Sequence, residues 1–144
     1  MLPDSITLNK GAIIERCIQR MREEYAADPE LENYTHMDAL ILNIERACQA
    51  TIDLAMHQVA QSHLGIPQSS ADAFVLLQKA GTISHELALR MSNMVGFRNI
   101  AIHQYQDLET EVIHFIMQHG IQDIIAFATT MHLRIADCRL QTTD

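Results

Sequence analysis

The sequence predicts an all-α protein, an up-and-down bundle of four main helices with one short inserted helix. Apolar residues recur at helical spacing in five stretches, and no alternating β pattern of useful length occurs. Only 5 Gly and 3 Pro interrupt the chain, so long helices are expected. Apolar residues make up 48% of the 144 residues, which is enough for one hydrophobic core. Residues 1–144 are therefore expected to form a single helical domain.

The first helix is expected over residues 5–26, because Asp28-Pro29 ends the pattern or follows its end. Its buried face is predicted from the apolar residues at helical spacing. These are Ile6, Ile13, Ile14, Cys17, Ile18, Met21 and Tyr25.

The second helix is expected to begin near Thr35, where Thr35 and Asp38 resemble a capping box. Gly65 and Pro67 are expected to stop it, since Gly suits a left-handed cap and Pro cannot continue a helix. At roughly 28 residues it would be about 42 Å long, which suits a bundle. Its predicted apolar stripe is Leu40, Ile41, Ile44, Cys48, Ile52, Ala55 and Val59.

Three further helices complete the prediction. A short one covers residues 70–80, capped by Ser69 or Ser70 and stopped at Gly81. The fourth begins at Ser84 and ends between residues 103 and 107, and its expected buried side is Leu87, Met91, Met94 or Val95, and Ile102. The fifth opens near residue 107 or 110, with Gly120 inside a pattern formed by Val112, Ile113, Ile116, Ile121, Ile124, Ile125 and Ala128. That Gly weakens the helix by up to about 1 kcal/mol unless a neighbour packs closely there.

The net charge of −8 argues against non-specific nucleic-acid binding, which needs a cationic face. The charge is unevenly spread, however. Residues 23–38 hold six acids and no Lys or Arg, whereas residues 73–106 hold three bases and one acid. A compact basic cleft on an acidic body is consistent with this distribution.

Nothing in the sequence suggests a membrane or secreted protein. No stretch approaches the roughly 20 apolar residues that span a bilayer, and the N-terminus lacks the features of a signal peptide. Cys17, Cys48 and Cys138 lack the paired spacing of a metal site and fall within helical patterns, so buried free thiols are expected. We therefore expect a cytoplasmic location.

The candidate chemistry is concentrated in residues 98–105, Arg-Asn-Ile-Ala-Ile-His-Gln-Tyr, at the expected end of the fourth helix. Cleavage of RNA by its own 2′-hydroxyl needs a base, an acid and a cation for the charge on phosphorus. His103 suits the proton transfers near neutral pH, and Arg98 suits the phosphate because it is permanently charged and bidentate. Asn99 can orient the phosphate or the imidazole.

Helix geometry complicates a site made by one chain. Asn99 and His103 are four residues apart and share a face. Arg98 and His103 are five apart and point about 140° away from each other on an ideal helix. Either the helix distorts or ends near His103, or a second chain supplies the missing partner.

The order of these residues resembles a known signature. Arg98-Asn99 followed by His103 resembles the Arg-(four to six residues)-His signature of HEPN domains, and Tyr105 matches the longer form found in HepT toxins. Residues 94–97 before the motif, 107–109 after it and 64–70 before the short helix also resemble the HepT group.

The resemblance implies an all-α homodimer in which two motifs meet in a cleft and cleave RNA, either tRNA or mRNA, without a metal or cofactor. Arg98 and His103 would be catalytic and Asn99 supporting. It also implies a type II toxin–antitoxin pair, in which an MntA-type nucleotidyltransferase antitoxin transfers AMP to Tyr105. Each AMP would add a phosphate and a stacking base beside the motif and so occlude RNA.

Two other interpretations remain open from the residues alone. A catalytically idle HEPN module would bind a nucleotide or a partner, and a structural helical adaptor would use the motif only as a helix cap. The remaining His residues do not favour a metal site, because His57 and His63, like His114 and His119, are not spaced to share a helix face.

Overall fold

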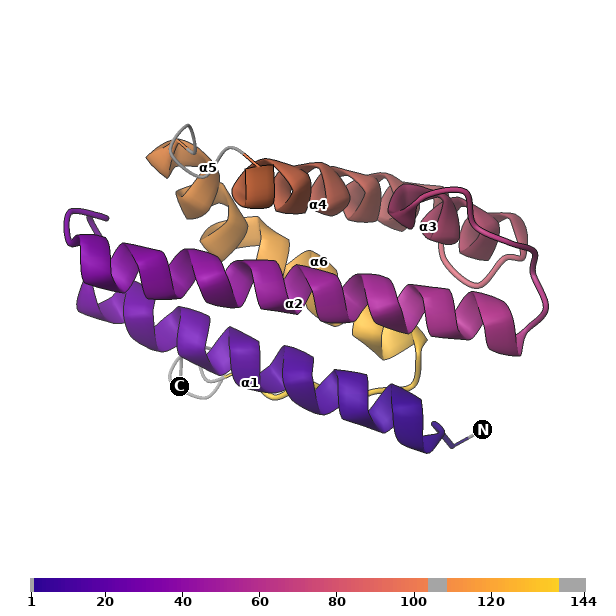
Figure 1. Ribbon diagram of the computed structural model, residues 1–144. Coiled ribbons are helices and arrows are strands. Elements are labelled where there is room, and N and C mark those ends of the chain that lie inside the picture. Colours follow the sequence, from indigo (N-terminus) through magenta and orange to yellow (C-terminus); the bar gives the residue numbers. More distant parts are fainter. Residues whose placement is uncertain (1, 104–108, 138–144) are drawn as a thin grey trace.

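The computed structural model describes residues 2–103 and 109–137, except for the side chains of residues 102 and 103. Its helices are α1 (Ser5–Ala27), α2 (Tyr34–Gln61), α3 (Ser70–Lys79), α4 (His85–His103), α5 (Thr110–Phe115), η2 (Ile116–Gly120) and α6 (Ile121–Thr130). Figure 1 shows α1 and α2 side by side and antiparallel, with α4 and α6 on the other side of α2 and α3 at one end. The predicted all-α bundle with a short inserted helix is confirmed. None of the described helices is long and apolar enough to cross a membrane.

Helix α1 begins at Asp4, whose carboxylate accepts a hydrogen bond from the backbone N–H of Thr7 at 2.8 Å. Its buried face contains Thr7, Gly11, Ile14, Cys17, Ile18 and Met21. The predicted inclusion of Ile6 and Ile13 was wrong, since they are 49% and 36% exposed. Ile6 and Ile13 lie seven residues apart and so share one side of α1, which is beside the buried face and not part of it. A small polar residue and a Gly take buried places that an apolar pattern does not identify.

Both ends of α2 differ in detail from the prediction. The N-cap is Asn33, whose Oδ1 accepts from the backbone N–H of His36 at 3.1 Å, so the predicted capping box at Thr35 was wrong. At the other end the left-handed residue is His63 (φ 55°) rather than Gly65. Leu64 N–H donates to the Val59 carbonyl, which closes a Schellman motif two residues before the Gly. The predicted apolar stripe of α2 is buried throughout.

The ends of α3 and the start of α4 match the prediction. Ser69 caps α3, and Gly81 (φ 78°) follows its end. Ser84 Oγ accepts from the backbone N–H of Leu87 at the start of α4. Leu87, Met91 and Val95 are buried as predicted, whereas the side chain of Ile102 lies outside the described part of the chain.

The predicted fifth helix is not a single regular helix. A π-helical turn, η2, separates α5 from α6, close to the Gly that the sequence marked as a weak point. A Cβ on Gly120 would approach Ile116 Cγ2 to 3.2 Å, so the wide turn is tightly packed around it. Arg22 from α1 donates to the Met117 carbonyl inside η2 at 3.1 Å. A hydrogen bond from another helix thus supports the irregular turn.

Residues 131–137 run back along α1 and complete the core (Figure 1). Leu133 packs on Gly11, and Ala136 N–H donates to Glu15 Oε1 at 3.0 Å. Asp137, whose side chain is fully buried, accepts from Arg22 Nε at 3.0 Å and from Nη2 at 2.8 Å. Arg22 therefore joins α1, η2 and the C-terminal segment.

Candidate functional site

Arg98 lies in the penultimate turn of α4 and is half-buried. Its Nη1 donates to Asn99 Oδ1 at 3.4 Å in an exposed hydrogen bond. Its Nε is buried and has no hydrogen-bond partner within residues 2–103 and 109–137. The stem is thus held against the bundle while part of the guanidinium reaches solvent. This placement suits a cation that receives an anionic ligand.

Arg98 also affects the thiol of Cys48 on α2. Burial raises the pKa of Cys48 to about 12, and the positive charge of Arg98 opposes that rise.

The remaining motif residues are described unequally. Asn99 is exposed and contacts Arg98. His103 is the last residue of α4, but its side chain lies outside the described part, and Tyr105 lies outside it entirely. The structure thus brings together Arg98 and Asn99 and leaves the contacts of His103 and Tyr105 as predictions.

Helix α4 is continuous from His85 to His103. Residues 98 and 103 therefore stay about 140° apart around its axis, as on an ideal helix. No distortion precedes His103, but the described part of α4 ends at that residue, so the end of the helix and a second chain are the two explanations of how an Arg and a His could face one phosphate.

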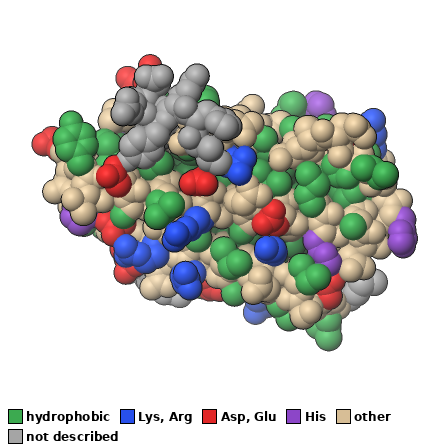
Figure 2. Space-filling view, in the orientation of Figure 1, with side chains coloured by type: hydrophobic (Ala, Val, Ile, Leu, Met, Phe, Trp, Pro, Cys, Tyr) green, Lys and Arg blue, Asp and Glu red, His purple; other side chains and the backbone are tan. Residues whose placement is uncertain are grey.

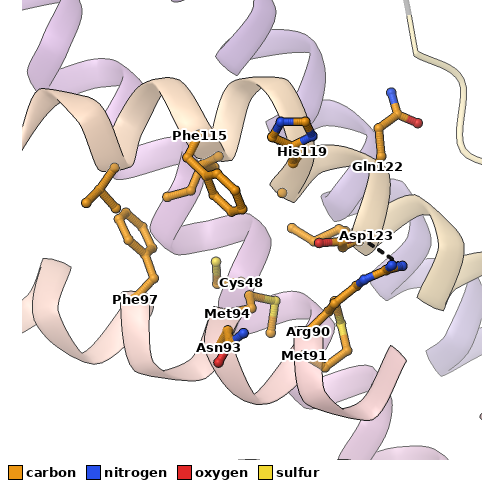
Figure 3. Close-up of a pocket in the computed structure, with 14 residues that line it drawn as sticks. Cys48, Arg90, Met91, Asn93, Met94, Phe97, Phe115, His119, Gln122 and Asp123 are labelled. Carbon is orange, nitrogen blue, oxygen red and sulfur yellow. Dashed lines mark ion pairs between the residues drawn. The ribbon is translucent and has the colours of Figure 1, made fainter. Parts of the chain in front are cut away.

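A cavity of about 520 Å³ lies beside the motif, between α4 and the α5–η2–α6 segment, with Cys48 at its floor (Figure 3). Phe97 from α4 and Phe115 from α5 line one end. The other end is polar and includes Arg90 and Asp123, whose Nη1 and Oδ1 atoms are 3.7 Å apart. The cavity is therefore apolar at the end nearer the motif and charged at the other.

Asp123 is a titratable group at the polar end of the cavity. Burial raises the pKa of its carboxyl, and the positive charge of Arg90 and the side chain of His119 partly oppose the rise. His119 also packs against Phe115, with ring centroids 5.0 Å apart. The sequence did not single out Phe115, His119 or Asp123, because their grouping depends on how the segment around η2 packs on α4.

The exposed charges are mixed rather than uniformly basic. Figure 2 shows Lys and Arg side chains over α1 and α2, near the end of α4, interspersed with Asp and Glu. Arg20, for example, pairs with Glu23 and Glu24. No group of three or more His, Cys, Asp or Glu arranged to hold a metal occurs among the residues that the structure describes.

An all-α bundle with an Arg-x4-His motif ending its penultimate long helix defines the class of HEPN-like helical proteins. The chain belongs to the HepT-like ribonuclease family, whose model matches residues 12–131. It is 41% identical over 125 residues to the mRNA nuclease HepT of Shewanella oneidensis, covering 86% of this chain and 94% of that protein. It is 27% identical over 74 residues to the tRNA nuclease HepT of Aphanizomenon flos-aquae, about half of each chain.

Solved structures agree with this assignment. A toxin–antitoxin crystal structure with AMP-PNP matches with a TM-score of 0.85 at 38% identity, covering 90% of this chain and 98% of that one. The tri-AMPylated S. oneidensis HEPN toxin in complex with MNT antitoxin matches with a TM-score of 0.84 at 39% identity and the same coverage. The resemblance inferred from the motif is confirmed, and the chain is a homologue of HepT toxins in an endoribonuclease family.

Proposed function

We propose that this protein is the toxin of a type II toxin–antitoxin pair, a metal-independent endoribonuclease that works as a homodimer in the cytoplasm. The observation that carries the proposal is Arg98, with a buried Nε and a partly exposed guanidinium, five residues before His103 on a continuous α4. Membership of the HepT-like ribonuclease family supports the reaction type.

The proposed reaction is an internal transfer at one RNA phosphate. A basic imidazole of His103 takes the proton of the 2′-hydroxyl, and the 2′-oxygen forms a bond to phosphorus. The bond from phosphorus to the 5′-oxygen breaks, and an imidazolium returns a proton to that leaving oxygen. Arg98 stabilises the charge on the phosphoryl oxygens, and Asn99 supports its orientation. The products are a 2′,3′-cyclic phosphate and a free 5′-hydroxyl.

The homodimer follows from two features of one chain. Each copy offers a single motif His, although the reaction uses a base and an acid. Arg98 and His103 also diverge by about 140° on α4. Two motifs facing each other across a two-fold axis supply two His and two Arg to one cleft.

The antitoxin is proposed to be a nucleotidyltransferase of the MntA type that transfers AMP to Tyr105. The similar S. oneidensis toxin is tri-AMPylated and bound to MNT antitoxin, which supports the same control here. Added phosphates near Arg98 would compete with RNA for the guanidinium. The RNA substrate is proposed to be mRNA or tRNA, in line with the two named relatives.

Expression of the chain without antitoxin tests the activity. Wild type should arrest growth and leave RNA fragments ending in 2′,3′-cyclic phosphate, whereas Arg98→Ala and His103→Ala should do neither. Arg98→Lys should restore little, because Lys lacks the planar fork. The matched controls are Arg16→Ala on α1 and His85→Ala at the start of α4, both exposed and outside the motif. An inactive wild type would favour the idle-module or adaptor interpretation, and activity that survives His103→Ala would contradict the assigned base.

Two measurements test the remaining parts. Intact mass after co-expression with the antitoxin should rise by one or more AMP units in wild type and stay unchanged in Tyr105→Phe. Light scattering should report a dimer at working concentration. Dimers that pair a wild-type chain with a His103→Ala chain should lose most activity if one cleft uses both His side chains, whereas retained activity in these mixed dimers would argue for a site within one chain.

A further inference from the structure

We propose that the cavity between α4 and the α5–η2–α6 segment binds a nucleobase that carries an exocyclic amino group. The proposal rests on the proposed function, since it gives the ribonuclease motif a neighbouring base subsite. Binding of a base in the cavity can be measured separately from catalysis, because the cavity is lined by none of the motif residues.

The first argument is the aromatic end of the cavity. Phe97 and Phe115 approach it from different helices, and both are labelled in Figure 3. Phe97 is 8% exposed and fixed in the core, whereas Phe115 is 59% exposed at the mouth. An exposed aromatic ring beside a cavity costs stability in water but offers a stacking surface for a flat base. The tilted contact between Phe115 and His119 orients this surface.

The second argument is the polar end. Asn93 from α4 and Gln122 from α6 are among the lining residues, and an amide side chain offers both a donor and an acceptor. The 3.7 Å separation of Arg90 and Asp123 is an ion pair longer than a hydrogen bond, so Asp123 can also accept from a ligand. The amides can serve any base, whereas the carboxylate of Asp123 only accepts and so favours a base that donates from an amino group, as adenine, guanine and cytosine do.

The third argument is the position of the cavity relative to the motif. Phe97 directly precedes Arg98 in the chain. The rise along α4 from Phe97 to His103 is about 9 Å, so the aromatic end of the cavity lies within about two turns of helix of both motif residues. A base in the cavity would therefore belong to a nucleotide close to the phosphate at Arg98.

The size and the mixed lining distinguish this cavity from an ordinary gap in a core. At about 520 Å³ it falls within the range of small-molecule sites. Empty packing defects are apolar, whereas this cavity has an ion pair at one end, aromatic rings at the other and two amide residues in its lining. That division matches the apolar faces and polar edges of a base.

The test is direct nucleotide binding by the full chain in a His103→Ala background, which permits production and leaves RNA intact. AMP, GMP, CMP and UMP are titrated by NMR. The first three should bind, and UMP should bind more weakly because uracil lacks the amino group. Phe115→Ala should weaken AMP binding roughly 5- to 150-fold through loss of stacking. Asp123→Asn should reduce the preference for AMP over UMP.

The control is Ile66→Ala, an exposed apolar residue between α2 and α3 that is 83% exposed and outside the cavity. It should leave AMP binding unchanged. A short RNA titrated against the same variants distinguishes two sources of the base. Weaker RNA binding by Phe115→Ala identifies a substrate base, and an effect on AMP alone identifies the adenylate of the modified toxin.

Two results would overturn the proposal. They are the absence of saturable binding by AMP, GMP and CMP, and an affinity for AMP that is unchanged in Phe115→Ala. If Phe115→Ala also loses the dimer while its affinity for AMP is unchanged, the cavity is instead a seat for a second copy. Failure of the growth and cleavage tests would remove the ribonuclease proposal without changing any of these titrations.

Discussion

Removal of the Arg22 side chain should destabilise the bundle more than any exposed substitution on α1. Arg22 is 11% exposed and Asp137 is 0% exposed, so their ion pair is shielded from water. Two parallel hydrogen bonds of 3.0 and 2.8 Å join them, and a third bond reaches the Met117 carbonyl. Arg22→Ala leaves a buried carboxylate without its guanidinium and a π-turn carbonyl without its donor.

The expected cost is about 3–5 kcal/mol, the usual penalty for removing one partner of a buried pair. At this chain length that corresponds to a fall in melting temperature of roughly 10–15 °C. Urea unfolding should show a lower midpoint with an unchanged slope, because the surface exposed on unfolding is the same.

Two variants make the measurement decisive. Arg20→Ala removes a 43% exposed Arg from the same helix, and its pairs with Glu23 and Glu24 should be worth less than about 1 kcal/mol. The double variant Arg22→Leu with Asp137→Leu should recover much of the loss, since apolar replacement of a buried pair is often nearly neutral. A cost for Arg22→Ala as small as that for Arg20→Ala would refute the view that this pair is desolvated.

Three further outcomes are expected. His63→Gly should stabilise the protein by about 0.5–1 kcal/mol in urea unfolding, because His63 holds a left-handed φ of 55° that Gly adopts without a steric penalty. A loss of stability would mean that the His side chain contributes contacts of its own. Asp4→Asn should lower stability at neutral pH but not in strong acid. The backbone N–H of Thr7 and the side chain of His57 hold the pKa of Asp4 at about 2. The stabilisation of the fold by the Asp4 carboxylate is therefore present above pH 3.8 and is lost as the pH falls towards 2. A stability difference between Asp4→Asn and wild type that does not change with pH would contradict this. Cys48, with its pKa raised to about 12 by burial, should resist alkylation at pH 8 until the protein unfolds, and rapid labelling of the native protein would show that α4 opens readily.

The periodic parts of the fold were predictable because burial on a long helix repeats every three or four residues. All seven residues predicted for the stripe of α2, from Leu40 to Val59, are buried, although further residues of this helix that the pattern did not identify, such as Leu54, are buried as well. The caps were less predictable, because Asn33 and Thr35 are both good N-cap residues and only the local backbone selects one. The π-turn at Ile116–Gly120 was not predicted, because the helical pattern continues through it and the hydrogen bond from Arg22 to Met117 joins residues 95 apart in the sequence.

In the candidate site, too, local features were predictable from the sequence and contacts between distant segments were not. Arg98, Asn99, His103 and Tyr105 were recognised from their order in eight residues, because spacing along one helix is a local property. The family comparison confirmed the resemblance that this order suggested. The cavity beside the motif was invisible in the sequence, because Phe97 and Phe115 come from different helices and become neighbours only when α4 packs against the segment around η2.

The sequence by itself determined the helical class of this protein and the main buried stripe of its longest helix, and it predicted the residues of the candidate site. Each of these is encoded by periodicity or by order within a few turns of helix. Only the tertiary structure decided that Arg22 joins α1 to Asp137 and η2, and that a cavity with aromatic and polar ends lies next to Arg98. Those features arise from contacts between distant segments, and their energies depend on burial that no local pattern specifies.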